Sequence, residues 1–238
     1  MTTALLFGST GLVGSNILET LSKLDSFTKI YTVSRRTPKT QSPKIEPIIN
    51  TDTDSWVKAF STLTPSVLIS ALGTTRAQAG GIQNQWKIDH DLNVDIAKQA
   101  KEQGIKTFVF ISSAGTRGFL SSYLPYSKMK IGVEDTIKSL GFDNAIILRP
   151  GGILGERETP HAGGPLLNAA IRGLGKISLG LQDTFGQEAE VIARAAVHAA
   201  KIAEEGKAPK NPWVLEAKDI VRLGRDEWKN VQAPAPAK

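Results

Sequence analysis

The chain has 238 residues, 40% of them hydrophobic, so it can bury one sizeable core and is too apolar to be disordered as a whole. Lysine and arginine outnumber aspartate and glutamate by 29 to 23, and the net charge of +6 weakly favours anionic ligands without requiring nucleic acid. The absence of cysteine excludes disulfides and thiolate chemistry, and no two of the three histidines share a helical turn, so we expect no metal site.

The first predicted strand, near 4–8, runs directly into three glycines spaced G-x-x-G-x-x-G, and an apolar-periodic helix follows. Gly8 permits a sharp exit from the strand, Gly11 lets the backbone approach a pyrophosphate, and Gly14 lets helix and sheet pack tightly. The free N–H groups at the start of the helix then receive the anion. We therefore predict that a dinucleotide cofactor binds at Gly8, Ser9, Thr10, Gly11, Leu12, Val13 and Gly14.

The second predicted strand, near 29–34, is followed by Arg35 and Arg36, where a site for NAD would place an acidic residue against the ribose hydroxyls. A guanidinium suits a 2′-phosphate, so these arginines favour NADP(H). A solvated basic loop is the alternative, because the whole stretch from Lys29 to Ile45 is basic and contains no acid. We predict a cofactor contact for both arginines and leave the lysines as surface residues.

Further cofactor contacts are predicted after the third and fourth strands, near 45–49 and 66–71. Asp52 could accept from the adenine amino group or cap the helix that begins near residue 54, and the sequence does not decide between the two. Leu72, Gly73 and Thr74 end the fourth strand, where a glycine lets the backbone lie against the adenine ribose. Arg76 is expected to line the site, and His90 to be a hydrogen-bonded structural residue.

The periodic segment 85–103 predicts a helix, and the strand near 107–112 that follows it ends at Ser113. Tyr126 and Lys130 lie four residues apart on the next predicted helix and so share one face. In a reductase, Tyr126 would protonate a substrate carbonyl as hydride arrives, Lys130 would lower the pKa of the phenol and hold the ribose, and Ser113 would orient the carbonyl. A chance pairing of an exposed tyrosine with a nearby lysine is the alternative.

The sixth strand, near 144–149, ends in Pro150 and Gly151, which could offer backbone groups to the nicotinamide amide or form a simple turn. Asn93 could bridge to the lysine through water or face solvent. The alternation of strands with helices predicts an α/β fold, a doubly wound parallel sheet with one domain over 1–230. We interpret 151–186 and 206–230 as a small C-terminal cap over the carboxyl ends of the strands, and 231–238 as a disordered tail.

The segments GSTGLVG, SSAG, YSKMK and LRPG together resemble an atypical short-chain dehydrogenase/reductase (SDR) with a Rossmann-type fold. The stretch ALGTTRAQAGG followed by KIDHDLN is similar to the fungal found-in-mitochondrial-proteome family, which is related to the animal Tat-interactive oxidoreductase homologue. The resemblance implies an NADP-binding protein that associates peripherally with the mitochondrial outer membrane, facing the cytosol. It also implies regulation through a protein partner, as in the animal relatives.

Two functions follow from the sequence. The first is an NADPH-dependent oxidoreductase of a small carbonyl substrate, and the second is a non-catalytic, NADPH-sensing protein that binds a protein partner. Nucleic-acid binding has only the modest positive charge to support it. No apolar run approaches the roughly 20 residues that cross a bilayer, so the residues alone indicate a soluble, intracellular protein.

Overall fold

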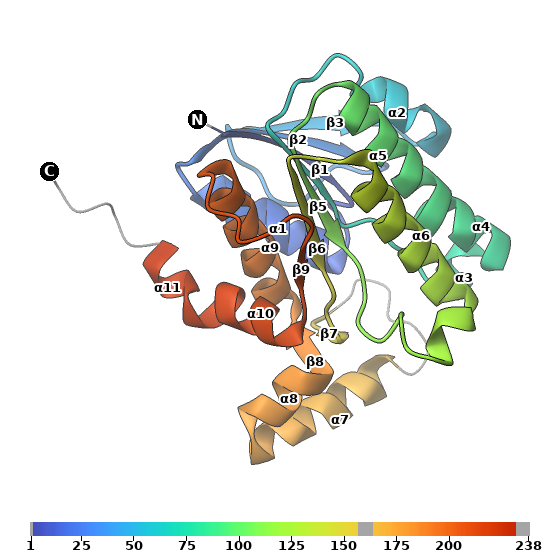
Figure 1. Ribbon diagram of the computed structural model, residues 1–238, viewed down its shortest axis with the longest axis vertical. Coiled ribbons are helices and arrows are strands. Elements are labelled where there is room, and N and C mark those ends of the chain that lie inside the picture. Colours follow the sequence, from blue (N-terminus) through green and yellow to red (C-terminus); the bar gives the residue numbers. More distant parts are fainter. Residues whose placement is uncertain (1, 157–163, 232–238) are drawn as a thin grey trace, which may run out of the picture.

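The structure is a computed structural model that describes residues 2–156 and 164–231, and at its centre lies a seven-stranded sheet in the order β3-β2-β1-β4-β5-β6-β9 (Figure 1). Every pair of neighbouring strands in this sheet is parallel. The strands are β1 (Thr2–Phe7), β2 (Phe27–Ser34), β3 (Ile45–Ile49), β4 (Val67–Ser70), β5 (Thr107–Ile111), β6 (Asn144–Leu148) and β9 (Trp213–Leu215). The predicted doubly wound parallel sheet is confirmed.

Both faces of the sheet are covered by helices, which explains why the central strands are apolar along their whole length. All residues of β4 and β5 are buried. Successive side chains of β1 point to opposite faces: Ala4 and Leu6 join one core cluster with α1 (Leu12–Lys23) and α9 (Ala189–Glu204). Leu5 and Phe7 join the other, with α2 (Trp56–Ala59), α5 (Leu92–Glu102) and α6 (Pro125–Leu140).

The order of the strands reverses beside β1. The chain runs outward from β1 to β2 and β3, and then returns to place β4 on the other side of β1. The carboxyl ends of β1 and β4 therefore meet without a connection between them, and open α/β sheets bind ligands in the crevice at such a point. The glycine turn after β1 and the segment after β4 are consequently brought together.

The segment predicted as one helix over 85–103 is more complex. It consists of α4 (Ile82–Trp86), a π-helical turn η2 (Lys87–Asp91) and α5. A short helix α3 (Arg76–Ala79) precedes it, and 3-10 turns lie at η1 (Thr53–Ser55) and η3 (Ser121–Tyr123). A π-turn adds one residue to a helical turn, so it changes the direction of the side chains that it carries.

The region after β6 departs from the sequence interpretation in two ways. A second, two-stranded parallel sheet pairs β7 (Gly152–Leu154) with β8 (Gly186–Glu188), and α7 (Gly164–Ile177) and α8 (Leu179–Phe185) lie between them in the chain, at the lower end of Figure 1. Neither strand was predicted. The interpretation of 206–230 as cap is corrected, because β9 extends the main sheet beside β6.

The helices after β9 also belong to the main body of the protein. They are α10 (Ala217–Val221), the π-turn η4 (Arg222–Asp226) and α11 (Trp228–Val231). Ile220, Leu223 and Trp228 are buried in the same core cluster as α1 and α9. A Cβ on Gly224 would lie 2.0 Å from the carbonyl oxygen of Val191 in α9, so the two segments are in backbone contact. The predicted tail lies outside the described residues, apart from Val231.

Candidate active site

The glycine turn after β1 has the geometry of a phosphate-binding loop. Gly8 has a φ of 82°, and a Cβ there would lie 2.6 Å from the carbonyl oxygen of Ala71 at the end of β4. A Cβ on Gly14 would lie 2.0 Å from the carbonyl oxygen of Gly8. Gly11 is exposed, and among the described residues a Cβ there would contact only the Gly8 carbonyl oxygen, at 3.4 Å. Two of the glycines therefore allow close packing, and the third faces outward.

The start of α1 presents backbone N–H donors to an anion. Gly11 is its N-cap, has no side chain to cap the helix, and no acidic residue lies in the first turn. The first N–H groups of a helix and its dipole favour a negatively charged group there. The Ser9 hydroxyl, buried in the same turn, has no hydrogen-bond partner among the described residues. The turn thus fits the diphosphate of a dinucleotide, which would supply acceptors for these donors.

Of the other residues predicted to bind the cofactor in this turn, one is buried in the core, one contacts the segment after β7 and one is partly exposed. Val13 is buried and belongs to the core cluster of α1, so it packs against the sheet. Leu12 lies against Gly155, whose Cβ would be 3.0 Å from the Leu12 side chain. Thr10 is partly exposed in the turn. The segment after β7 therefore reaches the entrance of the loop, which the sequence did not indicate.

Arg35 and Arg36 are exposed immediately after β2, at the same edge of the sheet as the glycine turn. The Ser34 hydroxyl donates to the carbonyl oxygen of Arg36 at 2.7 Å and shapes this turn.

Asp52 is the N-cap of η1, where its carboxylate accepts from the Asp54 N–H at 3.1 Å. The structure therefore places Asp52 in the capping role, one of the two alternatives that the sequence left open.

The segment after β4 is held by buried polar groups from α4 and the π-turn. The Thr74 N–H donates to the Asp89 carboxylate at 2.7 Å, and the Gln85 amide donates to the Thr74 carbonyl oxygen at 3.1 Å. Asp89 is completely buried, and this burial raises its pKa although the nearby Lys130 opposes the rise. Leu72 is buried and Gly73 is exposed. The backbone of this segment is therefore fixed beside the glycine turn.

The π-turn also determines the surroundings of Asn93. The side chain of Asn93 is buried, accepts from the Ser70 hydroxyl at 2.6 Å, and donates to the carbonyl oxygens of Ile88 and Asp89. It does not face solvent, so that alternative is wrong. His90 bonds to Asp91 at 2.7 Å and lies against Gly132 of α6, as expected of a structural histidine. Arg76 is exposed at the start of α3.

The three residues predicted to be catalytic come from neighbouring ends of β5 and α6. Lys130 is buried, and its ammonium donates to the carbonyl oxygen of Ile111 at 3.1 Å and lies 4.8 Å from the ring centre of Phe110. The same ammonium would lie 3.9 Å from a Cβ on Gly73, so it sits between the ends of β4 and β5. Tyr126, one helical turn earlier, is 40% exposed.

Ser113 is partly exposed beyond the end of β5, and its hydroxyl donates to the Ala114 carbonyl oxygen over a long distance of 3.4 Å. In the described part of the chain, no hydrogen bond joins the Tyr126 hydroxyl to Ser113 or Lys130. Pro150 lies beside this strand end, because its carbonyl oxygen accepts from the Ala114 N–H at 2.7 Å. The Gly151 N–H is already bonded, to the Gln187 amide oxygen at 2.8 Å.

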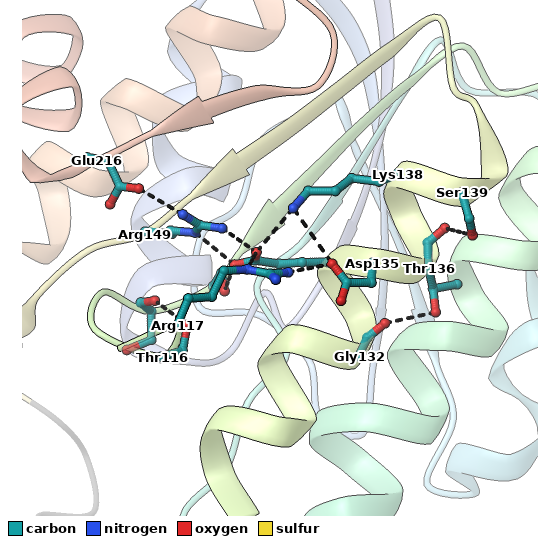
Figure 2. A network of polar contacts seen from close by, with 12 residues as sticks. Thr116, Arg117, Gly132, Asp135, Thr136, Lys138, Ser139, Arg149 and Glu216 are labelled. Atoms are coloured by element: carbon teal, nitrogen blue, oxygen red, sulfur yellow. Dashed lines mark hydrogen bonds and ion pairs between the residues drawn. The ribbon is translucent and has the colours of Figure 1, made fainter. Parts of the chain in front are cut away.

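A group of charged side chains beneath this edge was not predicted from the sequence. It centres on the buried Glu134 of α6, whose carboxylate accepts hydrogen bonds from Ser112, Arg117 and Arg149. Figure 2 shows Arg117 and Arg149 in this group. These partners hold the pKa of Glu134 below its usual range, although burial acts in the opposite direction. One feature of the sequence could have indicated that Glu134 is buried: it lies one helical turn after Lys130, between the apolar residues Val133 and Ile137.

Three comparisons with known proteins agree with this fold. A family model described as "NAD dependent epimerase/dehydratase family" matches residues 4–180. "Protein FMP52, mitochondrial" of Chaetomium globosum is 60% identical over 233 residues, which are 97% of this chain and 100% of the relative. "Protein fmp-52, mitochondrial" of Neurospora crassa is 62% identical over 235 residues, 96% of this chain and 97% of the relative.

Among solved structures, "MoeE5 in complex with UDP-glucose and NAD" is similar with a TM-score of 0.65 at 16% identity, over 94% of this chain and 81% of that one. At this identity the likeness shows the fold alone. Within the described residues, no helix combines the length and the apolar character needed to cross a membrane.

Proposed function

The chain belongs to the NAD dependent epimerase/dehydratase family, and from this membership we propose that it binds NADP(H) and reduces a small carbonyl compound. The observation that carries the proposal is the position of Lys130. Its ammonium is buried between the ends of β4 and β5, one helical turn from the accessible phenol of Tyr126, at the edge of the sheet where the glycine turn lies. A cation in this place would stabilise negative charge that develops on a nearby oxygen during the reaction.

The residues of this chain divide the work. The glycine turn and the start of α1 would hold the diphosphate, and Arg35, with Arg36 beside it, would bind the 2′-phosphate that distinguishes NADP from NAD. When bound, the reduced nicotinamide supplies a hydride. Tyr126 would donate its phenolic proton to the substrate oxygen, Lys130 would stabilise the phenolate left behind, and Ser113 would orient the carbonyl group.

Tyrosine replacement tests the catalytic part of the proposal. Tyr126→Phe should retain NADPH affinity within about twofold in calorimetry and lose turnover by roughly 100-fold or more, because general acid catalysis contributes 10²–10⁴-fold. Tyr123→Phe is the matched control, since Tyr123 lies three residues earlier, is also exposed, and has Ser127 instead of a lysine one turn later. Equal rates for wild type and Tyr126→Phe would remove Tyr126 from the mechanism.

A regulatory, non-catalytic function is the second candidate, and one observation favours it. The loop that leads to Tyr126 exposes four large apolar side chains, the most exposed of which is Phe119 at 88%; the others are Leu120, Tyr123 and Leu124. Apolar side chains gathered in this way are typical of surfaces that bind other proteins. This function predicts NADPH binding in calorimetry without turnover across a broad panel of aldehydes and ketones, whereas the reductase predicts turnover of at least one.

For location, we propose peripheral association with the mitochondrial outer membrane on its cytosolic side. The relatives named above are called mitochondrial, which supports the organelle, and the resemblance supports the membrane. Treatment of intact isolated mitochondria with protease should degrade the protein while matrix proteins survive. Alkaline carbonate should release it into the soluble fraction. Protection from protease in intact mitochondria would contradict the cytosolic side.

A further inference from the structure

The Glu134 carboxylate bonds to the end of β5, the end of β6 and the loop between β5 and α6, and Figure 2 labels two of its partners, Arg117 and Arg149. It is completely buried on α6 and accepts from the Ser112 hydroxyl at 2.6 Å and from Arg117 Nε at 3.2 Å. Arg149 binds it with two nitrogens, Nε at 3.0 Å and Nη2 at 2.6 Å. The third nitrogen of Arg149, Nη1, donates to the carboxylate of Glu216 at 2.9 Å, at the start of α10.

Each partner stands next to a segment of the proposed active site. Ser112 directly precedes Ser113, and Arg149 directly precedes Pro150 and Gly151. Arg117 belongs to the loop between β5 and α6, which leads to Tyr126. One carboxylate therefore holds the end of β5, the end of β6 and the loop that leads into α6.

Glu134 also stands on the helix that carries the proposed acid. Tyr126, Lys130 and Glu134 follow one another at intervals of four residues, so they share one stripe of α6. The carboxylate of Glu134 thus fixes the rotation and height of α6 against the ends of β5 and β6. A rotation of the helix would move the Tyr126 hydroxyl and the Lys130 ammonium relative to Ser113.

We infer that Glu134 is the positioning residue of this active site, acting through Ser112, Arg117 and Arg149 on the distance between Ser113 and Tyr126. The inference rests on the proposed reductase function. Replacing a buried ion pair by apolar residues of similar volume often costs no stability, so stability alone does not explain this cluster, whereas the positioning of the three segments does. A misplacement of reacting groups by about 1 Å can lower a rate by roughly 100-fold.

The test is Glu134→Gln, which keeps the shape of the side chain and removes its charge. We expect kcat for a carbonyl substrate to fall by roughly 10- to 100-fold while the Kd for NADPH changes by less than about threefold, because the glycine turn lies on β1 and α1. Glu134→Asp, which keeps the charge on a shorter side chain, should recover part of the loss. A merely structural role would instead lower kcat and NADPH affinity together, and Glu134→Asp would not recover kcat.

Asp135→Asn is the matched control. Asp135 is the next residue of α6 and also pairs with Arg117 and Lys138, but its side chain is 54% exposed and has no contact with Ser112 or Arg149. It should keep kcat within about twofold of wild type. Wild-type kcat in a folded Glu134→Gln protein would overturn the inference. If Glu134→Gln does not fold, Arg117→Ala replaces it, and the same loss of kcat at an unchanged NADPH affinity is expected.

Hydrogen exchange separates this inference from the proposed function. If the wild-type protein turns over no carbonyl compound, the reductase proposal fails, but the positioning of the loops can still be measured. Glu134→Gln should speed amide exchange in 112–118 and 149–151 by about tenfold and leave 8–14 unchanged. Exchange equal to wild type in those two segments would overturn the inference whatever the result for turnover.

Discussion

The carbonyl oxygen of Gly8 occupies the space that a side chain on Gly14 would need, since a Cβ on Gly14 would lie only 2.0 Å from it. The N–H of Gly11 donates to the same oxygen at 2.9 Å, so this one atom both closes the turn and packs against the first turn of α1. The strand and the helix are therefore in direct backbone contact at the glycine turn. Different glycines of this loop should respond differently to the same substitution.

Gly14→Ala should destabilise the protein by about 1–3 kcal/mol and abolish cofactor binding, because the methyl group forces α1 away from β1. Urea unfolding and NADPH calorimetry measure the two effects. Gly173→Ala is the matched control: Gly173 lies in α7 and a Cβ there meets nothing within 4 Å. It should stabilise the protein by up to about 1 kcal/mol and leave binding unchanged.

Gly11→Ala should separate binding from folding. Gly11 has an ordinary φ of −83°, and its Cβ would make only one contact, at 3.4 Å, so the fold should tolerate the methyl group. The methyl group would occupy the space in which we place the diphosphate, and we expect NADPH affinity to fall by at least about tenfold with an unchanged urea midpoint. Unchanged affinity would show that the diphosphate does not approach this residue.

Arg35→Glu tests the choice between the two nicotinamide cofactors. The change replaces a guanidinium by a carboxylate beside the proposed 2′-phosphate, so NADPH affinity should fall by roughly 100-fold while NADH affinity falls little. Calorimetry with both cofactors measures the difference. Lys39→Glu makes the same change of charge in the same basic segment and should reduce NADPH affinity by less than about threefold. Equal losses of NADPH and NADH in Arg35→Glu would place the 2′-phosphate elsewhere.

Glu134 should make the free energy of unfolding depend on pH. Its pKa in the folded protein lies below the usual 4.5, so the charged carboxylate stabilises the folded state above that pH and loses this contribution as the pH falls through its lowered value. Glu134→Gln should cost on the order of 2 kcal/mol near pH 7, and the difference from wild type should shrink below about pH 4.5. Urea unfolding of both proteins across this range measures it. A difference that is constant with pH would mean that Glu134 is not preferentially charged in the fold.

Asp89 should affect the pH dependence of stability in the opposite direction from Glu134, because burial raises the pKa of Asp89 in the folded protein. A raised pKa means that the folded state holds the proton more tightly, so this group lowers stability as the pH rises from the usual value of 3.8 toward the folded one. The comparison of wild type with Glu134→Gln removes this contribution, because both proteins contain Asp89. The acid dependence of the difference therefore reports on Glu134 alone.

The features that the sequence determined by itself are local. The glycine turn, the strands and most helices of the first 150 residues, and the spacing of Tyr126 and Lys130 on one face of a helix can be read from residues a few positions apart, because strand and helix periods are short. The family resemblance was also carried by short continuous segments. These features were enough to predict the doubly wound sheet and to place the glycine turn at its carboxyl edge.

Only the tertiary structure decided the contacts between distant segments. β7, β8 and β9 are strands of three residues each, too short to show a period; β7 and β8 form by pairing with each other, and β9 forms by pairing with β6. Asp89 reaches Thr74 because a π-turn redirects its side chain, and Glu134 joins Ser112 to Arg149 because α6 packs beside β5 and β6. The energy of these contacts depends on burial and on several segments packing at one place. A local sequence pattern contains no information on either.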